Sequence, residues 1–200
     1  MTELILASQS PARMQILKNA GFNPRSMPST VDEDALLPPN KADSVEHYVT
    51  TLSLAKAENV AESVTGDYLV IGADSALSFE NKILGKPLEP KTAISRWKQM
   101  RGKTGELFSG QSLVESKTGK SVTKFSATKV WFEDISDSEI ERYVESGEPL
   151  QVAGAFTIDS LGGGFIRRIE GDYHTVVGLS LNLLREMMAD LEYQYTDFWK

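Results

Sequence analysis

The predicted fold depends most on one stretch near the N-terminus, Leu4-Ile5-Leu6-Ala7-Ser8-Gln9-Ser10-Pro11-Ala12-Arg13-Met14-Gln15-Ile16-Leu17. Its apolar run 4–7 predicts a short buried strand, followed by a polar turn and a helix. Pro11 suits the first helical position, and Ser10 before it is a good N-cap. The turn offers hydroxyls from Ser8 and Ser10, free backbone N–H groups and the guanidinium of Arg13. These groups suit a phosphate chain, although an ordinary strand–turn–helix with a good cap explains the same residues.

Length, composition and charge narrow the class of protein. The chain has 200 residues, of which 40% are hydrophobic and 24% charged, as in one ordinary globular domain. It contains no cysteine, so disulfides and thiolate chemistry are excluded. Without a leader-like N-terminus or a long apolar run, the expected location is the cytoplasm, with no membrane partner. The net charge of −7 argues against nucleic acid as a partner.

A second informative segment is Tyr68-Leu69-Val70-Ile71-Gly72-Ala73-Asp74-Ser75. The continuous apolar run 69–71 predicts a central strand that is covered on both faces. Asp74 follows where that strand is expected to end, among small residues. Ligands of open α/β sheets bind outside the carboxyl ends of the strands, so this position favours a functional Asp74 over a surface carboxylate.

Two further stretches carry charged residues whose interpretation stays open. Asp32, Glu33 and Asp34 lie in an expected loop that Pro38-Pro39 closes. Such a run is usually solvated, but carboxylates are also the ligands of hard divalent cations. The spacing of apolar residues predicts a helix over 44–64, and Lys56 lies near its apolar face. A lone helical lysine is normally exposed to solvent.

The rest of the chain alternates between expected strands and helices. Residues 83–87 predict a hairpin return that presents Lys86, either for binding or as a solubilising turn residue. Strands are expected at 107–116 and 121–135, as an antiparallel segment with one wet face. Further helices are expected at 90–100, with Trp97 in the core, at 136–146 after a capping box, and at 180–191. This alternation predicts an α/β fold with a mixed, twisted sheet flanked by helices. His47 and His174 are interpreted as structural or surface residues, because no second zinc ligand accompanies them.

Several separated motifs together resemble the Maf family, nucleoside triphosphate pyrophosphatases that are sometimes described as septum-formation inhibitors. They follow one another in the family's order from residue 4 to about residue 188. The matching segments are 6–13, 31–33, 54–57, 70–75, 85–87, 143–149, 153–156, 169–173 and 177–179.

The resemblance implies a single Maf-like domain over 1–200, elongated and similar to inosine triphosphate pyrophosphatases, with room for two lobes and a cleft, and often a homodimer. It implies hydrolysis of the α–β anhydride of a nucleoside triphosphate with a divalent metal such as Mg²⁺ or Mn²⁺. Asp74 would activate water and share the metal with Glu33. The phosphate-binding positions would be Ser8, Ser10, Arg13, Lys56, Ser75 and Lys86. Because an ordinary Asp, with a pKa of about 3.9, is a poor base at neutral pH, this chemistry needs a metal that acidifies the attacking water.

Departures from the family pattern concern the substrate. The branch that cleaves dTTP and UTP carries Arg, Thr and Gln where this chain has Ala12, Ser75 and Asp159. The branch that acts on 7-methyl-GTP has an acidic residue at the last position and resembles segment 150–154. A carboxylate at Asp159 accepts from the N–H edge of guanine and repels the O4 acceptor of uracil or thymine. We therefore expect a purine or modified nucleotide as substrate and poor activity on dTTP and UTP.

An alternative function is that of a nucleotide-binding regulator of cell division or septum formation that does not turn over its ligand. The combination of Asp74 and Glu33 favours the enzyme, because a sensor has no need of a water-activating carboxylate.

Overall fold

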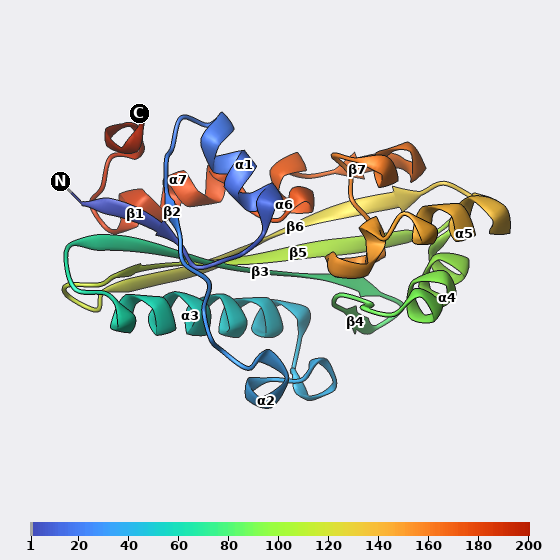
Figure 1. Ribbon diagram of the computed structural model, residues 1–200, viewed down its shortest axis with the longest axis horizontal. Coiled ribbons are helices and arrows are strands. Elements are labelled where there is room, and N and C mark those ends of the chain that lie inside the picture. Colours follow the sequence, from blue (N-terminus) through green and yellow to red (C-terminus); the bar gives the residue numbers. More distant parts are fainter. Residues whose placement is uncertain (1) are drawn as a thin grey trace. The chain divides into compact units, whose positions relative to one another are not determined.

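A computed structural model describes residues 2–200 and contains one seven-stranded mixed sheet flanked by helices (Figure 1). The strand order is β2-β1-β3-β5-β6-β7, and β4 pairs with β3. Strand β1 is parallel to both β2 and β3, whereas β4 is antiparallel to β3 and β7 is antiparallel to β6. The α/β class and the mixed sheet are therefore confirmed.

The strands are β1 (Glu3–Leu6), β2 (Arg25–Ser26), β3 (Tyr68–Phe79), β4 (Lys82–Leu84), β5 (Thr104–Glu115), β6 (Ser121–Phe132) and β7 (Ile166–Glu170). The α-helices are α1 (Pro11–Asn19), α2 (Glu33–Leu36), α3 (Val45–Ser63), α4 (Pro90–Met100), α5 (Asp137–Glu145), α6 (Tyr173–Val177) and α7 (Leu181–Asp190). Short 3₁₀ turns are η1 (Pro39–Lys41), η2 (Glu148–Gln151), η3 (Ala153–Ala155), η4 (Leu161–Phe165) and η5 (Tyr195–Phe198).

The chain divides into two compact units, and the long strands β3, β5 and β6 contribute residues to both. The first unit comprises the chain up to Asp74, Ser109–Ser126 and Gly178–Lys200; the second comprises Ser75–Phe108 and Ala127–Val177. Each unit has its own apolar core.

In the first unit, α3 covers one face of the sheet, and α1 and α7 cover the other (Figure 1). Strands β1 and β3 and helix α3 contribute most of one core cluster: Ile5, Ala7, Ala57, Val60, Ala61, Val70 and Val114. The aromatic C-terminal tail packs on this body, with the rings of Phe22 and Tyr195 4.7 Å apart.

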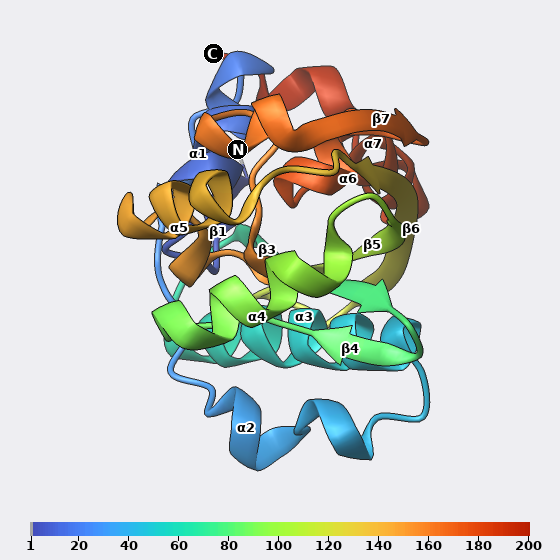
Figure 2. The ribbon, with the colours of Figure 1, turned by 90° about the vertical axis from the view of Figure 1, so that its right-hand side faces the viewer.

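In the second unit, α4 and α5 pack against each other (Figure 2). The indole of Trp97 is fully buried between them and donates to the Ala155 carbonyl at 2.7 Å. The rings of Phe132, Tyr143 and Phe165 approach it edge-on, with centroids 5.6–5.8 Å away. The expected core role of Trp97 is confirmed.

Helix starts follow the local capping chemistry of the sequence. The side chains of Ser10, Ser44 and Ser180 each accept from the backbone N–H three residues on. Ser136 and Glu139 form the expected capping box. The helices at 90–100 and 180–191 are found within one residue of the predicted bounds.

The strands expected at 107–116 and 121–135 are found as β5 and β6, which are neighbours in the one sheet. Two other expectations about the elements are wrong. Strand β5 has no wet face, because its residues 107–114 are all buried. The acidic run is a short helix rather than a loop, because the Asp32 carboxylate caps α2 by accepting from Ala35 N at 3.1 Å. Strand β7, which the sequence pattern did not indicate, pairs with β6.

Among the helices of residues 2–200, none combines the length and the apolar composition that crossing a bilayer requires.

Candidate active site

The turn between β1 and α1 has the structure that its sequence predicts. Ser8 Oγ accepts from Ser10 N at 3.1 Å, and Ser10 Oγ accepts from Arg13 N at 3.4 Å. Both hydroxyls are partly exposed. The turn follows directly on β1, whose register with β3 ends at the pair Leu6–Ile71. The serine turn and the start of α1 therefore lie beside β3 where this parallel pairing stops.

Arg13 ties this turn to two other segments of the first unit. Its Nη1 donates to the Ala73 carbonyl at 2.7 Å and to Ser8 Oγ at 3.4 Å, and its Nε donates to the Gly178 carbonyl at 2.9 Å. Burial lowers the pKa of Arg13, while the charges of Asp74 and Glu33 raise it. An arginine keeps its charge across such shifts, so a fixed positive charge stands at the end of the β1–β3 pairing.

Helix α3 lies unusually close to the sheet at two glycines. A Cβ at Gly72 of β3 would be 2.0 Å from the Ser53 carbonyl, and one at Gly110 of β5 would be 2.3 Å from the Val49 carbonyl. No side chain fits in either place, so the helix backbone rests directly on the sheet. A buried hydrogen bond of 2.9 Å between Ser53 and Ser112 joins the same two layers.

This close seat brings Lys56 of α3 to the carboxylates that the sequence analysis singled out. Its Nζ lies 2.5 Å from Asp74 Oδ1 and 2.8 Å from Glu33 Oε1. Lys56 and Asp74 are each only 7% exposed, whereas the Glu33 side chain is 42% exposed. The two acids are 41 positions apart in the sequence, yet they share one ammonium group. Lys56 is thus not the exposed surface residue that its helical position alone predicts.

The environment of Asp74 changes its acidity in opposing ways. Burial raises its pKa, Lys56 and Arg13 lower it by their positive charges, and Glu33 raises it again; the net direction is upward. A carboxyl with a raised pKa is a stronger base than an ordinary aspartate.

The expectation that β3 ends before Asp74 is wrong. The strand continues to Phe79, and Asp74 lies in its middle. Pairing with β1 ends at Ile71 and pairing with β4 begins at Leu77, so Asp74 lies in a section of β3 between these two partners. Strand β1 stops pairing with β3 at Ile71, close to the place where β3 itself was expected to end, but β3 continues past Asp74.

The predicted site residues fall into two groups. Contacts within the first unit connect Ser8, Ser10, Arg13, Glu33, Lys56 and Asp74. Ser75, which follows Asp74 in β3, belongs to the second unit, as do Lys86 and Asp159. Lys86 is exposed in the bend between β4 and α4. Asp159 is exposed near Tyr173, whose pKa is raised first by burial and then by the charge of Asp159.

Two residues of interest were not predicted. Tyr48 is buried on α3, and its pKa is raised by burial and by the charges of Asp74 and Glu33. Its place in the apolar stripe of α3 indicated only a core residue.

The second residue, Glu148, accepts hydrogen bonds from Tyr143 Oη at 2.9 Å, from the backbone N–H groups of Leu161 and Gly162 at 3.1 and 2.9 Å, and from Thr157 Oγ1. Burial works to raise the pKa of Glu148, but these donors outweigh burial and lower it to about 2. Glu148 lies in the segment 143–149 that matches the family pattern, but its role could not be predicted, because most of its partners follow it by 9 to 14 positions.

The carboxylates of Glu33 and Asp74 fit a divalent cation that is bound together with phosphate. Within residues 2–200 no cluster of three or more His, Cys, Asp or Glu side chains is suited to hold a metal alone. Two carboxylates already converge on a single cationic atom, the Nζ of Lys56. Mg²⁺ is commonly held by one or two carboxylates, with substrate phosphates and water as its other ligands. Glu33 and Asp74 match that pattern.

Fold and site together define a class: a mixed α/β protein with a buried carboxylate–lysine site beside the N-terminus of a helix. Comparison with known proteins then gives the family. The family model described as "Maf-like protein" matches residues 3–191, and the chain belongs to the Maf family.

Its relatives align over almost their whole length. A protein of Leifsonia xyli subsp. xyli, named "Nucleoside triphosphate pyrophosphatase", is 46% identical over 98% of this chain and 96% of its own. A protein of Synechococcus sp. with the same name is 47% identical over 98% of both chains. A solved structure of a nucleoside-triphosphatase (dITP/XTP pyrophosphatase) from Mycobacterium abscessus overlaps 67% of this chain and 74% of its own, with a TM-score of 0.41 and 13% identity. That overlap is too weak to support an argument.

Proposed function

We propose that this Maf-family enzyme hydrolyses the α–β phosphoanhydride of a nucleoside triphosphate and releases a nucleoside monophosphate and diphosphate. The name shared by its relatives supports this reaction. The observation that carries the proposal is the contact of one buried ammonium, Lys56 Nζ, with the carboxylates of Asp74 and Glu33. A site for hydrolysis of a polyanion needs both a base and positive charge, and this cluster contains both.

In the proposed reaction, Asp74 accepts a proton from the attacking water. Its burial and raised pKa support that role, because a base must hold a proton more tightly than an ordinary aspartate does. Direct attack by water is favoured because the sequence motifs include no activated nucleophile.

We assign phosphate binding to the cationic and hydroxyl side chains of the site. Arg13 and Lys56 supply charge next to Asp74, and Ser8 and Ser10 supply hydroxyls and a helix N-terminus. Ser75 and Lys86, both in the second unit, are proposed as further phosphate ligands from their places in the family motifs.

Glu33 and Asp74 are the residues that would hold a divalent cation such as Mg²⁺ or Mn²⁺. When bound, this ion supplies a water of lowered pKa and neutralises phosphate charge. Their shared contact with Lys56 keeps the two carboxylates close together before substrate binds.

For the base of the nucleotide, we propose a purine or a modified purine, with Asp159 as acceptor for the N–H edge. Exposure leaves this carboxylate accessible to a ligand. Values of kcat/KM on dTTP, UTP, GTP and 7-methyl-GTP check the assignment, and a clear preference for dTTP would contradict it.

The reaction is tested by diphosphate release in the presence of Mg²⁺ or Mn²⁺. We expect Asp74→Asn to lower the rate by about 10²–10⁴-fold, the usual cost of losing a general base. Asp137→Asn, at an exposed carboxylate that pairs with Lys98 and Arg101, is the matched control and should retain the wild-type rate. Titration calorimetry with nucleotide checks that the Asp74 variant still binds.

Two results would contradict the proposal. If Asp74→Asn hydrolyses nucleotide as fast as wild type, Asp74 is not the base. If the wild-type protein binds nucleoside triphosphates but releases no diphosphate, the regulator of division or septum formation becomes the better description. The expected homodimer stays a prediction, which sedimentation would check as a species of twice the 22.1 kDa chain mass.

A further inference from the structure

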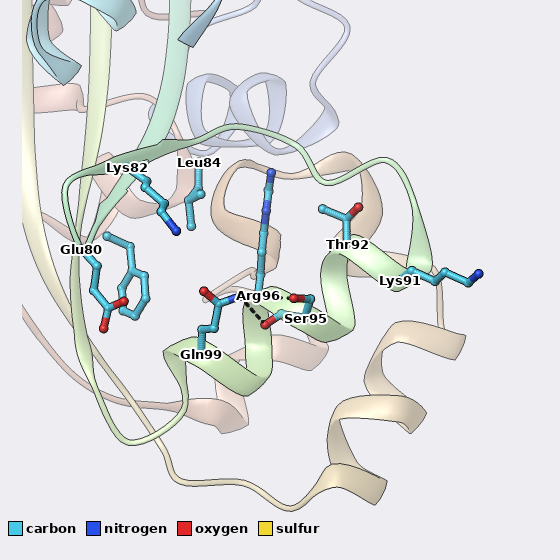
Figure 3. Close-up of a pocket in the computed structure, with 9 residues that line it drawn as sticks. Glu80, Lys82, Leu84, Lys91, Thr92, Ser95, Arg96 and Gln99 are labelled. Carbon is cyan, nitrogen blue, oxygen red and sulfur yellow. Dashed lines mark hydrogen bonds between the residues drawn. The ribbon is translucent and has the colours of Figure 1, made fainter. Parts of the chain in front are cut away.

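A cavity of about 390 Å³ lies between the β3–β4 hairpin and α4 in the second unit. Figure 3 shows that Arg96 extends from α4 across this cavity toward the segment that joins β4 to α4. Lys91, on the same helix, also lines the cavity, but the end of its side chain points away from Arg96 (Figure 3). Arg96 is partly buried, although a surface helix gives an arginine easy access to solvent. The partly buried position of the Arg96 side chain therefore needs an explanation.

The reason is a single hydrogen bond to the Gly85-Lys86-Pro87-Leu88 bend. Arg96 Nη1 donates to the Gly85 carbonyl at 2.6 Å. The same carbonyl accepts from Gly154 N at 3.2 Å. A charged donor makes the stronger bond of the two, so Arg96 is the main anchor at the start of the bend.

The far side of the bend is anchored as well. Leu88 N donates to the Leu150 carbonyl at 3.0 Å, and Pro87 is buried. Leu88 has φ +61°, a left-handed conformation that costs free energy for a residue with a side chain. Such strain persists only where neighbouring contacts hold the backbone in place. The bend is thus fixed on both sides of Lys86.

Packing at Gly85 does not explain this shape. A Cβ at Gly85 would meet no atom within 4 Å, and its φ is not in the left-handed region. The residue held between the anchors, Lys86, is exposed. The anchors therefore fix the backbone on both sides of one exposed lysine.

We propose that Arg96 is a positioning residue, which holds the Gly85 carbonyl and thereby directs Lys86 at the phosphates of the substrate. This inference rests on the proposed function, in which Lys86 binds phosphate. Preorganisation of this kind matters because a displacement of about 1 Å in a binding group can lower the rate about 10²-fold.

A double-mutant cycle in the full-length enzyme tests the inference by diphosphate release. We expect Arg96→Met to lower kcat/KM about 10-fold and Lys86→Met about 100-fold. If Arg96 acts through Lys86, the double variant is no worse than Lys86→Met, within about twofold. Lys91→Met, which removes a charge from the same helix without touching Gly85, is the matched control and should retain wild-type kcat/KM.

Two results of the cycle would overturn the inference: an unchanged Arg96→Met, or a double variant about 1,000-fold impaired, as independent effects require. If Arg96→Met does not fold, Arg96→Lys is put through the same cycle, with the same criterion of non-additivity.

Hydrogen exchange over residues 85–88 provides a readout that does not depend on activity. Exchange should be faster in Arg96→Met than in wild type or Lys91→Met, because the bend has lost its main anchor. Equal exchange in all three proteins would overturn the inference. Absence of diphosphate release by wild type would instead refute the proposed function, and the exchange experiment would still decide whether Arg96 fixes the bend.

Discussion

Replacing Glu148 by Gln tests how much the hydrogen-bonded carboxylate of the second unit contributes to the stability of the folded protein. Glu148 accepts from Tyr143, Thr157, Leu161 and Gly162. Glutamine keeps one acceptor oxygen but points an NH₂ group at donors on the other side. We expect the variant to unfold more easily, because those donors lose a charged acceptor.

The size of the effect follows from the pKa of Glu148, which is lowered from 4.5 to about 2. Each pKa unit corresponds to about 1.4 kcal/mol, which gives an upper bound of about 3.4 kcal/mol. Because the carboxylate is partly exposed, solvent screening reduces this to about 1–2 kcal/mol. A lowered carboxyl pKa stabilises the folded state fully above pH 4.5, and this stabilisation is lost as the pH falls through 2.

Urea unfolding of wild type and Glu148→Gln between pH 7 and pH 3 measures this contribution. The difference in unfolding free energy should fall to about two-fifths of its pH 7 value at pH 3. Glu145→Gln, at an exposed carboxylate paired with Arg142, should stay within about 0.5 kcal/mol of wild type throughout. A difference for Glu148→Gln that is absent at pH 7, or that does not change with pH, would refute the reasoning.

Three further substitutions have defined outcomes. Gly72→Ala should lower the unfolding free energy by about 3 kcal/mol and reduce diphosphate release, because its Cβ would meet the Ser53 carbonyl at 2.0 Å. The control in urea unfolding is Gly164→Ala, whose Cβ would meet nothing within 4 Å. Lys56→Met should cost about 3 kcal/mol in urea unfolding, because it removes the cation that Asp74 contacts directly and leaves this carboxylate buried. An unchanged midpoint would show that the ion pair contributes nothing. Ser136→Ala removes the capping box of α5 and should cost about 1 kcal/mol, seen as a fall of about 2–4 °C in Tm; an equal Tm would contradict the role of the cap.

The features that the sequence predicted well are those whose causes are local. A serine that caps a helix acts on an N–H group three residues away, so Ser10 and Ser136 could be identified from their neighbours alone. Helix α4 begins at its proline and keeps its apolar spacing to Met100. In each case the information lies within one or two turns of chain.

The predictions that were wrong concern features that depend on contacts between distant segments. Small residues before Asp74 suggested a strand end, but β3 continues because β5 and β4 pair with it further on. The burial of Lys56 depends on where α3 rests on the sheet. Patterns within one segment contain no information about either contact.

The candidate site was predicted in part. The resemblance to the Maf family supplied Asp74, Glu33 and Lys56, and their mutual contacts in the first unit agree with a shared cluster. Their roles in catalysis stay predictions, which the assays above test. Glu148 and Arg96 were missed, because each acts on backbone groups of a loop at least nine positions away in the sequence.

The two glycines beneath α3 have a consequence for how this family member tolerates change. Where a helix is spaced from a sheet by side chains, repacking those side chains can move it by fractions of an ångström. At Gly72 and Gly110 main chain meets main chain, and there is no adjustable layer between them. Substitutions elsewhere on α3 should therefore alter its surface without moving Lys56, whereas a single methyl group added at either glycine would displace the ammonium from both of its acids.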